Sequence, residues 1–470
     1  MVLTMSDAKN QSKLFGTHGV RVTVGDELTS ELALNLGYAL GTQLGEGRTV
    51  AIAYDPRTSS TLLESALTAG LLDCGCNVRR LGMTPLPVLS FGIRYLHTDA
   101  GVMITASHNP PEYNGIKFYS SDGSAFTYQQ DLEVENIYMS RKFSPASYTK
   151  KGKSEIVSDL GSAYIEAVKR YLDCRLISER DFSVVLDGGG GAASYLTPKL
   201  LTALGCKTIA INCEPNGLFA ERPLEPRPEN LALLMKTVKE KQASLGAAHD
   251  GDADRSAYVD EEGNFIQGDR ILALICHHVL KNHPGGTIVT PVNTSSVILD
   301  VAELVKAKVE WTAIGEPSVL ERMKEKNAEI GGEENVGLMF PKWSWAREGP
   351  FAISMVLNIM AEEGKKISAL LKEYPEYYSV KMNVPVPNGI FQKNKKRIMA
   401  NIQKMLPDDY DNIVAIDGYK VFYGKNWLLV RSSGTEPLFR IFVEASGKKE
   451  ASKLAALGLN IINEATKNMT

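Results

Sequence analysis

The sequence predicts an α/β protein in which three related α/β units are followed by a different, α+β unit. Three stretches share one pattern: a β-branched strand, a small or polar loop, an amphipathic helix and a second strand. They begin with the strands at residues 49–55, 184–187 and 287–290. Strands that alternate with helices at this spacing favour parallel pairing, and ligands of such sheets bind at the carboxyl ends of the strands. Three loops are therefore candidate walls of a site, at residues 57–60, 188–191 and 293–296.

The remaining elements follow in the same order along each repeat. Predicted helices come after the loops, at residues 63–72, 196–204 and 297–305. Second strands come next, around residue 78, at 208–211 and at 309–311. After residue 378 the pattern changes to a strand, a helix and further strands with Pro and Gly turns, and it ends in a helix at 448–467. This tail predicts a smaller α+β domain.

Changes in composition indicate the domain boundaries. A Lys/Ser-rich stretch at residues 147–155 predicts a first linker, and charged segments at 362–366 and 372–378 precede the change in pattern. The 470 residues are enough for about three domains of roughly 150 residues. With the smaller tail we expect four domains, at residues 1–152, 153–254, 255–374 and 375–470.

Composition and charge exclude several classes of protein. With 44% hydrophobic and 23% charged residues, the chain has the composition of a folded protein rather than of a disordered one. The 52 Lys and Arg against 55 Asp and Glu residues leave a net charge of −3. A charge so near balance argues against a nucleic-acid-binding surface and against a polybasic membrane anchor. We expect neither nucleic acid nor a membrane as a partner.

The cysteines and the N-terminal segment indicate a compartment. Six cysteines without a C-x-x-C pair indicate neither a disulfide framework nor a structural zinc site. The N-terminal segment is polar, and no apolar run reaches the roughly 18 residues of a membrane span. These features predict a cytoplasmic protein and leave the oligomeric state open.

A hydroxyl at the end of a predicted strand is a candidate nucleophile. Ser107 and its neighbour His108 lie in the segment 105–110, directly after the strand predicted at 101–104. The same residue types also form ordinary turns, and that alternative stays open for this segment alone. Lys117 is a further candidate, because a partly buried lysine can act as an acid or a base.

Three alternating carboxylates predict a metal site. Asp250, Asp252 and Asp254 can converge on one hard cation, since Mg²⁺ and Ca²⁺ prefer oxygen ligands. The spacing also resembles an EF-hand loop with Glu261 at its twelfth position, but Arg255 occupies the place where that loop needs glycine. We therefore expect a catalytic divalent-cation site, with a solvated acidic turn as the alternative.

Two later segments carry polar groups suited to a phosphorylated sugar. Residues 331–335 offer two carboxylates and an amide after two glycines, which can hydrogen-bond sugar hydroxyls or form a surface turn. Residues 431–437, together with Arg440, combine two guanidinium groups with hydroxyls and an exposed glycine backbone. This second set predicts a phosphate cradle, although it lacks the lysine of a Walker loop.

A glycine run in the second repeat supports a competing hypothesis. Residues 188–193 satisfy the G-x-G-x-x-A pattern after a strand, and Glu214 ends the following strand, as a dinucleotide site requires. The corresponding loops of the other repeats are not glycine-rich, which favours a repeat loop over a nicotinamide-binding site. A nicotinamide-dependent dehydrogenase remains the second hypothesis, and non-enzymatic sugar-phosphate binding the third.

Taken together, these segments resemble one family, the α-D-phosphohexomutases, which contains phosphoglucomutase, phosphomannomutase and phosphoglucosamine mutase. The resemblance spans nearly the whole chain, in the family's order and spacing. It rests on residues 15–21, 105–110, 250–255, 332–335 and 431–437. In motif the chain is most similar to archaeal members.

The resemblance implies a fold and an activity. The fold would be three related α/β domains with mixed sheets and a smaller C-terminal domain around a central cleft. The activity would be the interconversion of hexose 1-phosphate and hexose 6-phosphate, for glucose, mannose or glucosamine. One Mg²⁺ per chain and a hexose 1,6-bisphosphate activator and intermediate would be required. A phosphopentomutase of the same family is the alternative substrate class.

The resemblance also implies roles for individual residues. Ser107 would be the phosphoserine, and it would hold Mg²⁺ together with Asp250, Asp252 and Asp254. Four residues would assist transfer of the phosphoryl group: Lys117, His108, Arg21 and Arg255. Eight would bind the substrate: Gly315, Glu333, Asn335, Arg431, Ser433, Gly434, Thr435 and Arg440.

The chain departs from the common family pattern at a few positions. His18 stands where Asp or Ser is usual, and Val22 follows Arg21 where Gly is common. Val336 and Gly337 replace the Gly-His pair that many bacterial members carry after the sugar-binding acid.

Overall fold

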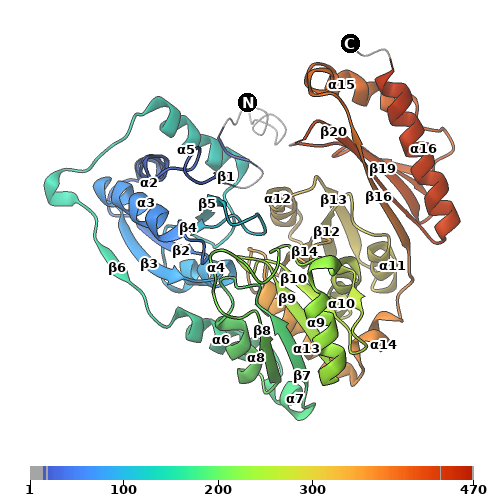
Figure 1. Ribbon diagram of the computed structural model, residues 1–470, viewed down its shortest axis with the longest axis horizontal. Helices are drawn as coiled ribbons and strands as arrows, with labels where there is room; N and C mark the ends of the chain where they lie inside the picture. The colour runs from blue at the N-terminus through green and yellow to red at the C-terminus, as the bar shows by residue number, and fades with distance from the viewer. Residues whose placement is uncertain (1–13, 17–18, 435, 468–470) are drawn as a thin grey trace. The chain divides into compact units, whose positions relative to one another are not determined.

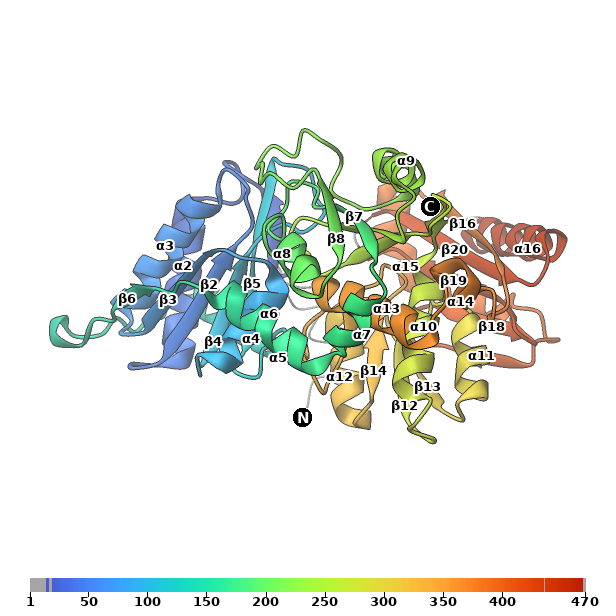
Figure 2. The same ribbon diagram turned by 90° about the horizontal axis from the view of Figure 1, so that it is seen from below.

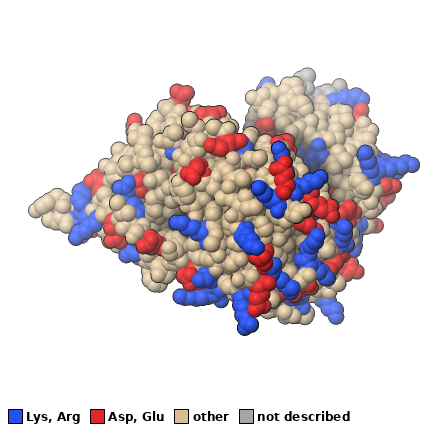
Figure 3. Space-filling view, turned by 60° about the horizontal axis from the view of Figure 1, so that its bottom comes forward, with Lys and Arg blue, Asp and Glu red and all other residues tan. Residues whose placement is uncertain are grey.

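The computed structural model describes residues 14–16, 19–434 and 436–467 (Figure 1). It divides into two compact units, the first formed by residues 1–271 and 335–371 and the second by 272–334 and 372–470. Among the described residues, no helix is both long and apolar enough to cross a membrane. Basic and acidic side chains are interspersed on the face drawn in Figure 3.

The first unit contains a mixed six-stranded sheet built from the first repeat. Its strands, in spatial order, are β1 (Val20–Thr23), β5 (Tyr113–Ser120), β4 (Ala100–Ile104), β2 (Thr49–Tyr54), β3 (Asn77–Met83) and β6 (Ser154–Ile156). β2 pairs in parallel with β3 and β4, whereas β5 is antiparallel to β4 and β1. The parallel pairing predicted for the first repeat is therefore present. The stretch predicted as a linker contains the exposed edge strand β6, which pairs with β3.

Helices cover both faces of this sheet (Figure 2). The helices are α2 (Ser30–Leu44), α3 (Ser60–Asp73), α4 (Leu86–Tyr95) and α5 (Tyr128–Ser140). Because both faces are covered, β4 is buried along its whole length, as expected of an interior strand. α2 and α3 approach closely because Gly70 has no side chain; a Cβ there would lie 2.7 Å from the backbone nitrogen of Tyr38.

A second mixed sheet in the first unit contains the second repeat. Its strands, in spatial order, are β11 (Phe265–Ile266), β10 (Ser256–Val259), β9 (Leu245–His249), β7 (Ser183–Asp187) and β8 (Lys207–Ile211). Its helices are α6 (Leu160–Tyr171), α7 (Cys174–Glu179), α8 (Leu196–Ala203), α9 (Ala232–Lys241), α13 (Gly349–Glu363) and α14 (Ile367–Leu371). β7 is parallel to β8 and β9, and β10 returns antiparallel to β9. The acidic segment 250–255 is therefore the turn of a hairpin.

The second unit combines the third repeat with the C-terminal domain. β12 (Thr287–Pro291) pairs in parallel with β13 (Lys308–Thr312) and β14 (Ile330–Gly332). The helices of this repeat are α11 (Val297–Leu304) and α12 (Glu316–Lys326). α10 (Gly268–Leu280) precedes the repeat, and the short strand β15 (Leu338–Met339), which follows it, belongs to the first unit.

The C-terminal domain is a five-stranded antiparallel sheet covered by two helices. Its strands, in spatial order, are β16 (Tyr378–Pro385), β20 (Leu438–Ala445), β19 (Asn426–Ser432), β18 (Tyr419–Tyr423) and β17 (Asn412–Val414). α15 (Asn388–Lys404) and α16 (Lys448–Thr466) pack together on it. The different, α+β tail predicted after residue 378 is confirmed.

A buried lysine joins the third repeat to the C-terminal domain inside the second unit. Lys420 Nζ donates to the carbonyl of Thr294 at 3.0 Å. It lies 4.1 Å from the ring centroid of Trp311 and 3.9 Å from that of Trp427. Desolvated cation–π contacts of this kind are worth about 2 kcal/mol or more, so the two domains are held together at this point.

Candidate active site

Ser107 lies in a tight loop directly after β4. Its backbone has φ +52°, the left-handed region that non-glycine residues rarely adopt. The Ser107 amide donates to Thr105 Oγ1 at 2.8 Å, and the side chain is 1% exposed. A strained backbone of this kind persists only where surrounding contacts hold it.

Arg57 supplies those contacts. Its guanidinium pairs with Asp55 at 3.0 Å, and neither side chain is exposed. Its other donors reach four backbone carbonyls, those of Ser107, Asn109, Pro110 and Tyr113. The first repeat loop thus fixes the shape of the candidate nucleophile loop. Sequence reasoning placed the loop 57–60 at a site wall but did not assign this role to Arg57.

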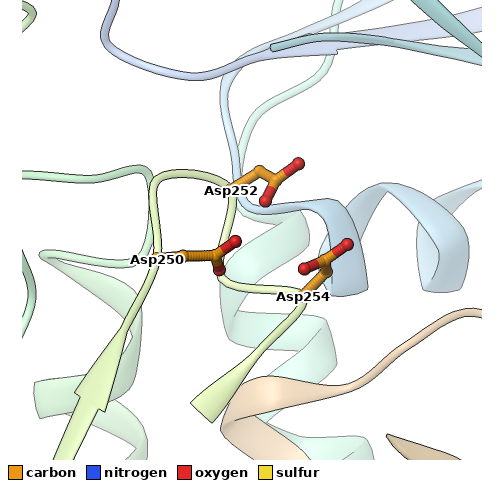
Figure 4. A group of neighbouring side chains, drawn as sticks. All are labelled: Asp250, Asp252 and Asp254. Atoms are coloured by element: carbon orange, nitrogen blue, oxygen red, sulfur yellow. The ribbon is translucent and has the colours of Figure 1, made fainter. Parts of the chain in front are cut away.

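The three predicted carboxylates meet in the hairpin turn between β9 and β10. Figure 4 shows Asp250, Asp252 and Asp254 projecting from this one turn. One oxygen of each lies within 4.8 Å of the others, and all three side chains are fully buried. The alternative of a solvated acidic turn is therefore wrong for this conformation.

Each carboxylate uses one oxygen to bind a neighbouring side chain. Asp250 Oδ2 accepts from Ser107 Oγ at 2.8 Å, and Asp252 Oδ2 accepts from Lys117 Nζ at 2.8 Å. Asp254 Oδ2 pairs with Arg347. The other oxygens of Asp252 and Asp254 are buried and have no hydrogen-bond partner among the described residues. Buried carboxylate oxygens left in this way fit a hard cation.

The electrostatics of the turn also favour a cation. Burial, followed by repulsion from Asp254 and Asp252, raises the pKa of Asp250 well above its ordinary value. Burial alone would raise the pKa of Asp252 too, but Lys117 and other nearby cations outweigh it and hold that pKa low. A bound cation would relieve this repulsion between the carboxylates.

The other predicted reactive residues of the first unit gather around Ser107. His108 Nδ1 lies 3.2 Å from Ser107 Oγ, and burial together with the charges of Arg255 and Arg21 lowers the pKa of His108 to about 2. His108 is therefore neutral at physiological pH. Arg21 donates to Asn109 Oδ1 at 3.2 Å, and Arg255 lies 3.8 Å from Asp254.

A buried histidine closes the acidic turn. His249 Nδ1 lies 2.9 Å from the carbonyl of Arg255, and its Nε2 lies 3.1 Å from Thr197 Oγ1. Burial lowers the pKa of His249 to about 4, so the ring is neutral. Arg222, paired with Asp187 at 3.0 Å, donates to the His249 carbonyl. Sequence reasoning missed all of these supports, since no local pattern marks them.

The residues predicted to bind sugar hydroxyls are separately anchored. In the second unit, Glu333 Oε1 accepts from the amide of Gly315 at 3.2 Å, and Gly315 has φ +124° just before α12. In the first unit, Asn335 Oδ1 accepts from the amide of Gly337 at 3.0 Å. Gly315 is thus hydrogen-bonded to Glu333, one of the residues predicted to bind the sugar.

The predicted phosphate cradle lies at the end of β19 in the second unit. Arg431 is directly opposite Arg440 on β20, and it pairs with Asp417 at 3.0 Å. The Nε atoms of both arginines are buried without a hydrogen-bond partner in the described part of the chain. Ser433 is buried, Gly434 is exposed, and Thr435 lies outside the described residues, as does His18. Lys395, which donates to the Ser433 carbonyl at 3.1 Å, was not predicted.

Comparison with known proteins decides the family. Four domain models of phosphoglucomutase/phosphomannomutase match in order: α/β/α domain I at residues 12–145, domain II at 162–263, domain III at 267–378 and the C-terminal domain at 382–457. A Thermococcus kodakarensis protein named phosphoglucomutase/phosphomannomutase is 40% identical over 459 residues, which are 97% of this chain and 99% of that protein. The chain belongs to the phosphoglucomutase/phosphomannomutase family.

Two further similar proteins support the same family. A Pyrococcus abyssi protein named "Probable phosphoglucosamine mutase" is 38% identical over 457 residues, 97% of this chain and 99% of its own. The crystal structure of a phosphoglucomutase/phosphomannomutase family protein from Burkholderia thailandensis matches with a TM-score of 0.87 at 26% identity, over 100% of this chain and 99% of that chain. The predicted family is confirmed, and so is the predicted fold of three α/β domains followed by a smaller α+β C-terminal domain. The chain is therefore a phosphohexomutase-type enzyme, an isomerase of the intramolecular phosphotransferase class.

In this family member the glycine run 188–191 supports the acidic turn. A Cβ on Gly191 would lie 2.8 Å from the carbonyl of Gly251, and the amide of Ala192 donates to that carbonyl. The four glycine amides donate to Ile211, Asp187, Asn212 and Gly188. A dinucleotide site would need such amides for its pyrophosphate, so this loop does not support the dehydrogenase hypothesis.

Proposed function

We propose that this enzyme interconverts hexose 1-phosphate and hexose 6-phosphate through a phosphorylated Ser107. One observation carries the proposal. Ser107 Oγ is hydrogen-bonded to Asp250 at 2.8 Å in a fully buried cluster of three carboxylates, two of which keep an oxygen without a hydrogen-bond partner among the described residues. A positioned acceptor next to a cation site is what phosphoryl transfer requires.

Two half-reactions account for the exchange. In the first, the bond between Ser107 Oγ and phosphorus breaks, a bond from phosphorus to a sugar oxygen forms, and the proton of that sugar hydroxyl ends on Ser107 Oγ. In the second, the Ser107 hydroxyl attacks the other phosphate of the hexose bisphosphate, and the bond from that phosphorus to its sugar oxygen breaks. The proton of the Ser107 hydroxyl passes to the leaving sugar oxygen, and neutral His108, 3.2 Å from Ser107 Oγ, assists the transfer. Lys117, Arg21 and Arg255 supply positive charge and proton donors near the transferred group.

The acidic turn fits one Mg²⁺ per chain. Asp250, Asp252, Asp254 and an oxygen of phosphorylated Ser107 would hold the ion, and all four ligands are of the hard oxygen type that Mg²⁺ prefers. A bound Mg²⁺ supplies positive charge beside the phosphoryl oxygens. Within the described part of the chain, one oxygen each of Asp252 and Asp254 has no hydrogen-bond partner, which supports this assignment.

The second unit would hold the part of the substrate that does not react. The proposed cradle for the unreactive phosphate consists of Arg431, Ser433, Gly434, Thr435 and Arg440. Gly315 and Glu333 of this unit are proposed contacts to the sugar, as is Asn335 of the first unit. The Nε atoms of Arg431 and Arg440 have no hydrogen-bond partner among the residues that the structure describes, which supports the cradle, because a guanidinium pairs well with phosphate oxygens.

The sugar is the first thing to measure. Names of the relatives divide between phosphoglucomutase/phosphomannomutase and phosphoglucosamine mutase. Turnover of glucose, mannose and glucosamine 1-phosphates should be compared with Mg²⁺ and a trace of the hexose 1,6-bisphosphate as activator. If none of the three is converted, pentose phosphates should be tested next. Failure of every sugar phosphate would contradict the proposal.

The nucleophile has its own test. Protein purified from cells should contain a fraction one phosphate heavier, mapped to the peptide around Ser107. Ser107→Ala should lose that mass and roughly 10⁴-fold or more of the turnover, as removal of a covalent nucleophile does. Ser65→Ala, an exposed serine on α3, should keep both. Full activity of Ser107→Ala would contradict the assignment of Ser107 as the nucleophile.

A further inference from the structure

Arg347 is a buried cation that reaches the acidic turn from outside the predicted motifs. It lies two residues before α13, in the first unit, and its side chain is 8% exposed. Its Nη2 bonds to Asp254 Oδ2. No sequence pattern discussed above includes it.

The contact with Asp254 matches the contact between Lys117 and Asp252. In both cases a buried cation takes Oδ2, while Oδ1 has no hydrogen-bond partner among the described residues. A carboxylate with one oxygen held in this way cannot rotate freely, so its other oxygen keeps a defined direction. Groups that orient metal ligands by such hydrogen bonds commonly affect metal affinity 10–100-fold.

Gly337 provides the space through which Arg347 passes. A Cβ at position 337 would fall inside van der Waals contact of Arg347 Cδ and 3.3 Å from its Nε. The amide of Glu348 donates to the carbonyl of Leu338 at 2.9 Å, which fixes the two segments side by side. Gly337 does not have positive φ, so the backbone itself does not demand glycine there.

The backbone that follows Arg347 packs against the acidic turn. A Cβ on Gly349 would lie 2.5 Å from the carbonyl of Ala253 and 2.6 Å from that of Arg255. The first residues of α13 therefore pack on the backbone of the acidic turn, and Arg347 is tethered close to its partner.

We propose that Arg347 is a positioning residue of the metal site, which directs Asp254 Oδ1 toward the cation, and that Gly337 is small in order to admit it. The inference rests on the proposed function, because it takes the acidic turn as a divalent-cation site. The alternative is that Arg347 competes with Mg²⁺ for Asp254 and must be displaced by it. In that case, removal of Arg347 would tighten metal binding.

Metal binding by the whole, dephosphorylated chain tests this directly. Titration calorimetry with Mg²⁺ should give a 10–100-fold larger dissociation constant for Arg347→Ala than for the unaltered chain. Arg347→Lys keeps the charge but loses the planar fork, so its affinity should fall between them. Unchanged or tighter binding by Arg347→Ala would overturn the proposal.

A double-mutant cycle separates positioning from general damage. Gly337→Ala should displace the Arg347 side chain and weaken Mg²⁺ binding by a similar factor. When Arg347 is already alanine, the space is empty and Gly337→Ala should add little. An equal factor in both backgrounds would mean that Gly337 does not act through Arg347, which would contradict the proposal.

Arg180 offers a matched control, because it binds the C-terminal end of α13 from outside that helix. Its Nε donates to the carbonyl of Ala361 in α13 at 3.0 Å. Arg180→Ala should therefore leave Mg²⁺ affinity unchanged; an equal loss would show that any loosening of α13 suffices. If the unaltered chain binds no Mg²⁺, the metal site of the proposed function fails. If it binds, Asp252→Asn weakens binding and Arg347→Ala does not, only the role of Arg347 fails.

Discussion

The proposed reaction centre of the first unit and the proposed phosphate cradle of the second are built differently. Around Ser107, the carboxylates and Lys117 are at most 1% exposed, and each of these groups is bonded to another side chain. In the cradle, Gly434 is exposed with no atom of the described chain within 4 Å of a Cβ placed on it. The Nε atoms of Arg431 and Arg440 have no hydrogen-bond partner in the described chain.

The difference teaches where each site obtains its order. A group that must stabilise charge in a transition state works best when it is fixed before the reaction, and burial in ion pairs achieves this. A cradle that must accept either end of a bisphosphate benefits from donors that the ligand itself completes. Ordering the cradle's donors when the ligand binds costs part of the binding energy. The groups of the reaction centre are already ordered, so no such cost arises there.

The largest effect on stability should come from the buried ion pair of the reaction centre. Asp252→Asn leaves the Lys117 charge buried without its partner, which costs about 3–5 kcal/mol of unfolding free energy. Lys117→Met combined with Asp252→Asn should recover most of that loss but no activity. Denaturant unfolding and the mutase assay measure the two effects. Excess Mg²⁺ should restore the activity of Asp252→Asn only partly, and an active variant indifferent to chelator would contradict the metal site.

A second buried carboxyl of the first unit should make stability depend on pH. Burial raises the pKa of Glu348 from 4.5 to about 7, although Tyr164 donates to it at 2.6 Å. Because the folded state holds this proton more tightly, its contribution is complete below pH 4.5 and is lost as pH rises to about 7. The loss amounts to about 3 kcal/mol.

Unfolding measured across this window should show the slope in the unaltered chain and a flatter profile in Glu348→Gln. Glu112→Gln, an exposed carboxyl, is the control and should keep the slope. Identical profiles for all three chains would mean that burial does not perturb Glu348.

The cradle should respond in affinity rather than in stability. Arg431→Ala should weaken hexose 1-phosphate and hexose 6-phosphate alike, by roughly tenfold to a hundredfold, because a charge-assisted contact is worth about 1.5–3 kcal/mol. Arg431→Lys should fall between, and Ser107 should remain phosphorylated. Calorimetric titration with both regioisomers is the measurement. Weakening of only one of them would show that the cradle does not serve both half-reactions.

The smallest effects come from a matched pair of glycines. In the reaction centre, a Cβ on Gly251 would lie 2.5 Å from the carbonyl of Ser107, so Gly251→Ala should cost about 1–3 kcal/mol. In the cradle, Gly434→Ala meets open space and should change stability by less than about 0.5 kcal/mol. Equal shifts in the denaturant midpoint would remove the contrast between the two sites.

Some of the site could be predicted because its residues are close in sequence. Asp250, Asp252 and Asp254 occupy one turn, so their spacing alone indicated a shared cation. The strand before Ser107 and the change of pattern after residue 378 were equally local. The glycine run at 188–191 could not be assigned from sequence to a repeat loop or to a dinucleotide site. Its pattern is local, and only its packing on the acidic turn distinguishes the two.

By itself, the sequence determined the three repeated strand–loop–helix units, the different C-terminal domain and the candidate site residues, because periodicity and short spacing are properties of neighbouring residues. The tertiary structure alone decided what holds those residues in place. Arg57 reaches Ser107 across 50 positions, and Arg347 reaches Asp254 across 93. Such pairs form only when separate strands and helices pack, and no local pattern records which distant cation will neutralise which buried carboxylate.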